Sequence, residues 1–191
     1  MNNNILESNL DDYYNINDNI SKLHKILNDK KTSLRVLDWF VTNYSKKNNT
    51  YYNIYQYDDK KYKYKLDEND DYKLIKFNIY SSYKSQLKSF SKKYFDPFCR
   101  RQRISKTYKT YKLETTIGQL NFFKWCIDYF ILDYVKENYN KIEKDMNDNI
   151  KISNKTTTIN KKGTTPKRKE LSKSIYNGLN KTNGKTVVYF D

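Results

Sequence analysis

Twenty tyrosines and nine phenylalanines are the feature that most constrains how this chain of 191 residues can fold. Hydrophobic residues make up 37% of the sequence, which is low for a compact protein. The aromatic side chains supply bulky, partly apolar surface where aliphatic residues are missing. Because a chain of this length holds little more than one domain of ordinary size, we predict a single domain with an aromatic core.

Electrical charge is the second constraint. Lysine and arginine number 37 against 22 acidic residues, so the formal net charge is +15 at pH 7. The chain has no alanine and is rich in Asn, Lys, Tyr and Ile, a bias typical of codons made mostly of A and T. That bias favours Lys but equally permits Asp and Glu, so it does not account for the excess. A strongly basic surface indicates polyanionic partners.

Three aromatic-rich segments are predicted to be strands, over 51–57, 61–66 and 72–80. Their residues alternate with period two, and Asp, Asn and Lys separate the segments. This pattern is typical of a three-stranded antiparallel meander. The segment 108–114 is the candidate for a fourth strand.

Helices are predicted to cover this sheet, over 33–45, 82–94 and 117–146. The second follows from Tyr83, Leu87 and Phe90 on one face, and Pro97 stops it. Thr116 and Gln119 have the spacing of a capping box, which marks the start of the third. Its core-facing side chains would be Leu120, Phe123, Ile127, Phe130 or Ile131, Tyr134 and Ile142.

The predicted organisation is therefore a single α+β domain over 32–147, a small antiparallel aromatic-rich sheet packed with three helices. Residues 1–31 are expected to be a mobile arm with one short helix after Asp18. Residues 148–191 are expected to form a flexible basic tail, because large apolar residues are almost missing before Val187. The last residues could add a terminal strand to a sheet edge.

The most informative stretch for function is 84–112, with ten basic residues against one acid, Asp96. Guanidinium and ammonium groups along a helix edge and the following loop would suit a phosphodiester backbone. The spacing of the first three lysines predicts one stripe along the helix. The candidate phosphate contacts are Lys84, Lys88, Lys92, Lys93, Arg100, Arg101, Arg103 and Lys106. The alternative is a solvated face made basic by codon bias.

A second basic cluster lies in the predicted tail, at Lys167, Arg168 and Lys169. A flexible basic tail binds nucleic acid without sequence preference, and it also fits a nuclear-import signal. We predict an auxiliary electrostatic contact. A solubilising linker is the alternative.

Enzymatic activity is not expected. The single histidine, His24, has no partner spacing for a triad or metal site, and four glycines leave little material for a phosphate-cradling loop. A tyrosine nucleophile beside the arginines remains a formal alternative, as does a Cys99 thiol activated by Arg100. Cys99 and Cys126 are expected to be reduced and buried. No cofactor, metal or membrane span is predicted.

Four segments resemble an uncharacterised protein family of nucleocytoplasmic large DNA viruses, the giant viruses. They are LRVLDWFVTNYSKKNN (34–49), YKSQLKSFSKKYFDPFCRRQRI (83–104), TIGQLNFFKWCIDYFILDYV (116–135) and KRKELSKSIYNGLNKTNGKTVVYFD (167–191). The resemblance implies a virion or virus-factory protein, in the host cytoplasm, the nucleus or the virus particle. It implies no catalytic residue.

Together these observations predict a non-enzymatic protein that binds DNA or RNA largely through phosphate contacts. The alternative, from another class, is a structural assembly protein that packs against other viral proteins. Binding that weakens steeply with salt would favour the first, and a large exposed apolar patch with self-association would favour the second.

Overall fold

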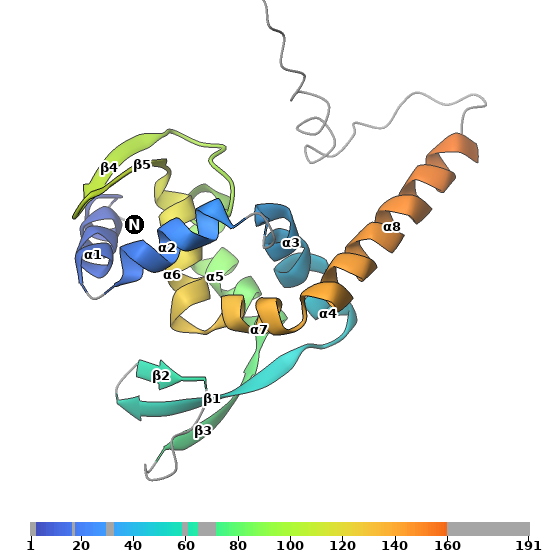
Figure 1. Ribbon diagram of the computed structural model, residues 1–191, viewed down its shortest axis with the longest axis horizontal. Helices are drawn as coiled ribbons and strands as arrows, with labels where there is room; N and C mark the ends of the chain where they lie inside the picture. The colour runs from blue at the N-terminus through green and yellow to red at the C-terminus, as the bar shows by residue number, and fades with distance from the viewer. Residues whose placement is uncertain (1–2, 17, 30–32, 59–60, 65–71, 160–191) are drawn as a thin grey trace, which may run out of the picture. The chain divides into compact units, whose positions relative to one another are not determined.

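The computed structural model describes residues 3–16, 18–29, 33–58, 61–64 and 72–159. The chain divides into two units, residues 1–150 and 151–191, and the arrangement given below is that of the first. The predicted α+β class is confirmed: helices surround a core, with a small antiparallel sheet and a separate β-hairpin on opposite sides of them (Figure 1).

The N-terminal segment forms two helices, α1 (Asn3–Asn15) and α2 (Asn19–Asn28). Their buried apolar side chains are Leu10, Tyr14, Ile20, Leu23 and Ile26. The Tyr14 hydroxyl donates a hydrogen bond to the Leu120 carbonyl at 2.8 Å, which ties α1 to the centre of the fold. The prediction of a mobile arm is therefore wrong for the described part of 1–31. Abundant Asn and Asp concealed an apolar face at helical spacing.

The predicted helix over 33–45 is confirmed. It is built from α3 (Leu34–Trp39), a π-helical turn η1 (Phe40–Tyr44) and a last turn α4 (Ser45–Lys47). The Ser33 hydroxyl accepts a hydrogen bond from the Val36 amide, so it caps the first turn.

The three predicted strands form one antiparallel sheet from β1 (Tyr51–Asp58), β2 (Lys61–Lys63) and β3 (Lys73–Asn78). The strand order is β2-β1-β3, so the predicted meander order is wrong. Pairing β1 with β3 places Tyr52 opposite Phe77 and Ile54 opposite Ile75. Direct apolar pairs of this kind stabilise a sheet, and they put β1 in the middle.

Helix α5 (Ile79–Tyr94) follows β3 directly and is capped by the Asn78 side chain, which accepts from the Ser81 amide. It starts three residues before the predicted 82. The predicted fourth strand is wrong as a single strand: 108–114 spans the turn of a hairpin between β4 (Ile104–Tyr108) and β5 (Tyr111–Thr115). Lys109 takes a left-handed φ of 52° in that turn.

The predicted long helix over 117–146 begins as expected but is not continuous. Thr116 accepts from the Gln119 amide at the start of α6 (Ile117–Asp128). The chain breaks at Phe130, whose φ of 56° is left-handed, before α7 (Ile131–Glu137) and α8 (Tyr139–Ile159). The break turns Tyr129 and Phe130 to the sheet, where Tyr129 stacks on Phe77 with centroids 4.7 Å apart.

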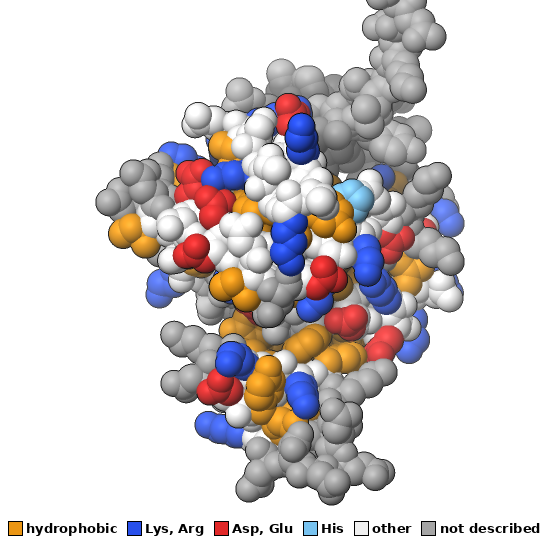
Figure 2. Space-filling view, turned by 60° about the vertical axis from the view of Figure 1, so that its left-hand side comes forward, with side chains coloured by type: hydrophobic (Ala, Val, Ile, Leu, Met, Phe, Trp, Pro, Cys, Tyr) orange, Lys and Arg blue, Asp and Glu red, His pale blue; other side chains and the backbone are white. Residues whose placement is uncertain are grey.

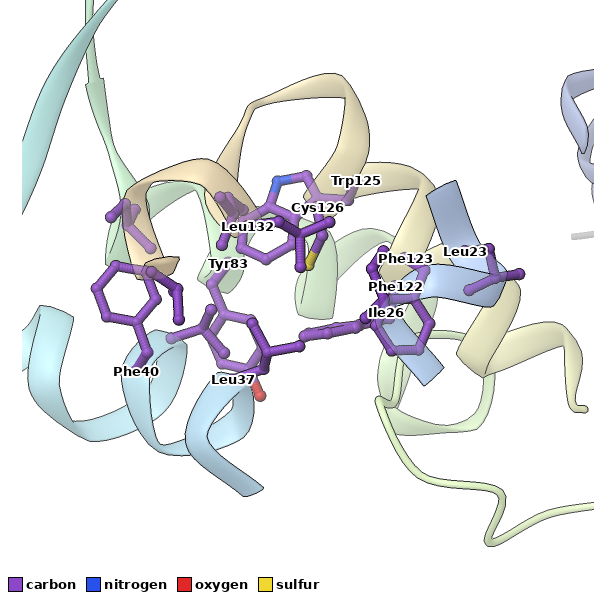
Figure 3. Close-up of a cluster of buried hydrophobic side chains, with 14 of the residues drawn as sticks. Leu23, Ile26, Leu37, Phe40, Tyr83, Phe122, Phe123, Trp125, Cys126 and Leu132 are labelled. Carbon is purple, nitrogen blue, oxygen red and sulfur yellow. The ribbon is translucent and has the colours of Figure 1, made fainter. Parts of the chain in front are cut away.

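Aromatic side chains make up much of the core, as predicted. Phe122, Phe123 and Trp125 of α6 lie among Leu23, Leu37 and Tyr83 from other helices (Figure 3). On the inner face of the sheet, Tyr52 stacks on Tyr134 at 5.1 Å. The sheet is thus held to the helices by stacked rings, each pair of which adds about 0.5–1.5 kcal/mol beyond its buried area.

Helix α8 continues to Ile159, so the start of the predicted tail, 148–159, is helical. The rest of that tail, with its possible terminal strand, lies outside the described residues.

Candidate nucleic-acid interface

Helix α5 presents the main cluster of exposed cations. Lys84, Lys88, Lys92 and Lys93 are exposed, and no acidic residue occurs in the helix. Tyr83 anchors the opposite side by packing against Phe95 and Trp125. Ser91 has a φ of 56°, so the helix is kinked there. The predicted single stripe therefore holds only for Lys84 and Lys88, because Lys92 and Lys93 come after the kink in the helix.

Arg100 is not a free phosphate contact, contrary to the prediction. Its guanidinium donates to both oxygens of Asp96, from Nε at 2.9 Å and from Nη2 at 2.7 Å. The Asp96 side chain is buried, and its oxygen also accepts from the Phe98 amide. A buried carboxylate needs such a partner. Arg100 therefore stabilises the loop that follows α5.

The two neighbouring arginines remain on the surface. Arg101 is exposed. Arg103 lies 3.6 Å from the Glu114 carboxylate of β5, and both side chains are largely exposed. An ion pair of this kind contributes little energy, so Arg103 can exchange Glu114 for a phosphate.

Lys106 is also a structural residue rather than a free cation. Its ammonium lies 2.7 Å from Glu7 and 2.8 Å from Asp11, and only 19% of the side chain is exposed. The Tyr108 hydroxyl donates to the same Asp11 at 2.6 Å. These contacts bind β4 to α1. The prediction failed because the acids that neutralise Lys106 are almost a hundred positions earlier in the sequence.

The tail candidates Lys167, Arg168 and Lys169 lie outside the described residues, so the structure does not place them.

Sequence reasoning missed the outer face of the sheet. Along β1, Tyr52 and Ile54 are buried while Tyr51 and Tyr57 are exposed. Lys76 of β3 lies over the Tyr51 ring at 3.7 Å. The alternation of tyrosine with polar residues was used to predict strands, and it equally indicated that one set of rings would point outward.

No group of three or more His, Cys, Asp or Glu suited to a metal ion occurs within the described ranges. His24 packs against Tyr111 at 4.8 Å and lines an open cavity of about 440 Å³ with Leu132 and Lys136. Burial raises the pKa of the Cys99 thiol, and the nearby charge of Arg103 opposes this only in part. Burial therefore opposes the activation of Cys99 that the alternative requires.

None of the described helices is long and apolar enough to cross a bilayer.

These features define a small α+β protein with an aromatic core and a basic helix on its surface. The chain belongs to DUF7197, a family of unknown function whose profile matches residues 1–188. It is similar to the Uncharacterized protein L507 of Acanthamoeba polyphaga mimivirus, with 41% identity over 159 residues. That alignment covers 79% of this chain and 53% of the mimivirus protein, so the chain spans about half the length of that relative. The resemblance to an uncharacterised giant-virus family is confirmed. No solved structure matches the chain.

Proposed function

We propose that this protein binds nucleic acid without catalysing a reaction, through phosphate contacts made by α5 and the loop that follows it. The observation that carries the proposal is the basic face of α5, with four exposed lysines and no acid in 16 residues. Lysines so placed attract a polyanion, and binding is favoured by the entropy of the condensed counterions that the polyanion releases.

The contrast with the other cations of the same segment supports this assignment. Arg100 and Lys106 are neutralised by carboxylates inside the fold. Within the described part of the chain, Lys84, Lys88 and Lys92 form no ion pair. Among the predicted phosphate contacts that the structure describes, the lysines of α5, Arg101 and Arg103 are therefore available to phosphates. The Lys93 ammonium lies 5.0 Å from the centroid of the Tyr94 ring.

The family supplies a context for this proposal. A basic protein of a giant virus would meet nucleic acid in the virus factory of the host cytoplasm, in the nucleus or in the virion. An assembly role through contacts with other viral proteins is the second candidate, favoured by the exposed side chains Tyr51, Tyr57 and Leu74.

The test compares two triple variants that remove the same charge from different helices. Lys84→Ala, Lys88→Ala and Lys92→Ala together remove three cations from α5. The control, Lys136→Ala, Lys141→Ala and Lys144→Ala, removes three exposed lysines that lie among acidic residues of α7 and α8. Affinity for unrelated DNA and RNA sequences is measured by fluorescence anisotropy across a salt series.

The α5 variant is expected to bind all sequences more weakly. Its plot of log affinity against log salt should be flatter by about 0.7–0.9 for each phosphate that a lysine no longer neutralises. The control should keep the slope of the wild type. Equal slopes for both variants, or no binding by the wild type at moderate salt, would contradict the proposal and favour the assembly role.

A further inference from the structure

The outer face of the three-stranded sheet carries a set of tyrosine rings that the core does not use. Tyr51 and Tyr57 are each 49% exposed, whereas Tyr52 and Ile54 of the same strand are buried. Leu74, opposite Tyr55 in the register, is 58% exposed. Large apolar side chains exposed along one face of a sheet are candidates for a binding surface.

Two of the rings on this face, those of Tyr55 and Tyr57, meet the ring of Tyr72. Tyr72, just before β3, lies edge-on to Tyr55 and Tyr57, with centroids 6.5 and 6.2 Å apart. Because β1 pairs with β3 over six positions, the backbone beneath the rings is held by a regular ladder of hydrogen bonds. The tyrosines are therefore presented on a rigid support, which lowers the entropy cost of binding.

Lysines lie directly beside these rings. The Lys76 ammonium is 3.7 Å from the centroid of Tyr51, and that of Lys63 is 5.2 Å from Tyr72 and 5.7 Å from Tyr57. We call this set, Tyr51, Tyr55, Tyr57, Tyr72, Lys63 and Lys76, the sheet platform. Figure 2 shows hydrophobic and basic side chains side by side over the sheet, in the lower part of that view.

A surface of rings with neighbouring ammonium groups suits one class of ligand. Every base has a flat face that stacks on an aromatic ring, and every nucleotide carries a phosphate for a lysine. A duplex hides its base faces in its own stack, whereas a single strand exposes them. A protein partner would gain from the lysines only where it placed carboxylates beside them, whereas every nucleotide of a strand carries a phosphate.

We propose that the sheet platform stacks unpaired bases of single-stranded DNA or RNA, while Lys63 and Lys76 contact the adjoining phosphates. This inference rests on the proposed function and adds strandedness to it.

The experiment distinguishes binding through the bases from binding through the phosphates. Full-length protein is titrated with labelled oligothymidylate and with an abasic strand of equal length, which keeps the phosphates and lacks the bases. The test variant is Tyr51→Ala with Tyr57→Ala. The matched control is Tyr51→Phe with Tyr57→Phe, which keeps both rings and removes only the hydroxyls. Both positions are exposed, and circular dichroism checks that the fold is retained.

The alanine variant is expected to bind oligothymidylate at least roughly tenfold more weakly than the wild type does. Its affinity for the abasic strand should equal that of the wild type. The phenylalanine variant should match the wild type on both strands. If all proteins bind both strands equally, the sheet platform is overturned while the phosphate-binding function stands. If the wild type binds neither strand, both fail. Sedimentation showing a wild-type dimer that the alanine variant breaks would overturn the inference in favour of a contact between copies.

Discussion

At the scale of single residues, Arg100 and Arg101 show that neighbouring cations have unrelated roles. Both belong to the run predicted to bind phosphate. Arg100 reaches back to the buried Asp96 with two hydrogen bonds, and its guanidinium covers the Phe98 ring at 4.8 Å. Arg101 points to solvent. We therefore expect replacement of Arg101 to leave stability unchanged, and replacement of Arg100 to lower it.

Arg100→Ala is expected to lower the free energy of unfolding by about 1–3 kcal/mol, because it leaves the Asp96 carboxylate buried without its charged partner. Denaturant unfolding measures the loss. Arg101→Ala is the matched control and should stay within about 0.5 kcal/mol of the wild type. Equal stability of the two variants would show that the Asp96 contact contributes nothing.

Asp38 gives the fold a pH dependence of known sign. Burial raises the pKa of its carboxyl to about 6, against the opposing positive charges of Arg100 and Lys92. The unfolded carboxyl ionises at an ordinary pKa of about 3.9. Between these values the folded protein binds more protons than the unfolded chain, so the free energy of unfolding falls as the pH rises from about 4 to about 6.

Asp38→Asn is expected to remove that part of the pH dependence and to be more stable than the wild type at neutral pH, by up to about 3 kcal/mol. Thermal unfolding from acidic to neutral pH measures both effects. Asp133→Asn, at an exposed position, is the control and should follow the wild type. A destabilised Asp38→Asn protein at neutral pH would mean that the ionised carboxylate has a favourable partner in the fold.

At the scale of elements, α1 is part of the core. It contacts α6 through Tyr14, and Lys106 and Tyr108 of β4 hold its Asp11. The Tyr13 hydroxyl also donates to Asp128 at 2.7 Å. Hydrogen bonds from two other elements fix this helix, so it is expected to unfold together with the rest of the domain.

Leu10→Ala in α1 is expected to destabilise the whole domain by about 2–5 kcal/mol, as large-to-small changes at buried positions do. The exposed Ile16, just past the end of the same helix, supplies the control Ile16→Ala. Denaturant unfolding followed by tryptophan fluorescence measures both, since both tryptophans lie outside α1. If Leu10→Ala leaves the tryptophan transition unchanged, α1 is not coupled to the core.

The elements also show what a sequence can and cannot predict. Thr116 and Gln119 predicted the start of α6 correctly because a capping box is a local interaction. The break at Phe130 has no local signature: apolar residues keep helical spacing across it, and the stacking of Tyr129 on Phe77 of a distant strand accounts for it. In the same way, the role of Lys106 depended on carboxylates that only the fold brings near. Asp96 lies four residues before Arg100, and what the sequence did not show is that its side chain is buried.

At the scale of the whole molecule, charge is unevenly distributed. Segment 84–112 carries ten basic residues and one acid, whereas 113–150 carries four basic residues and seven acids. Inside the basic segment, the ion pairs of Arg100 with Asp96 and of Lys106 with Glu7 and Asp11 neutralise part of the charge, and the four lysines of α5 stay exposed. An asymmetry of this kind raises the rate at which a polyanion meets the basic side.

Residues 160–191 include eight basic and two acidic residues, so they add to the net positive charge of the protein. Deleting them is expected to weaken nucleic-acid binding and to reduce its salt dependence. Full-length protein with Lys167, Arg168 and Lys169 changed to Gln is the control, and it should show part of the same reduction in slope. Anisotropy across a salt series measures both. An unchanged slope after deletion would leave this segment without a part in binding.

The two free thiols, Cys99 and Cys126, differ in accessibility. Cys126 is fully buried in α6, and burial holds the pKa of its thiol well above the ordinary value. Only a thiolate reacts with an alkylating reagent, so Cys126 becomes modified when the core opens. In a Cys99→Ser background the alkylation rate of Cys126 would report the population of open states when reclosing is faster than alkylation. Cys126 is thus a native probe of transient opening of the core, and no label has to be introduced into the domain.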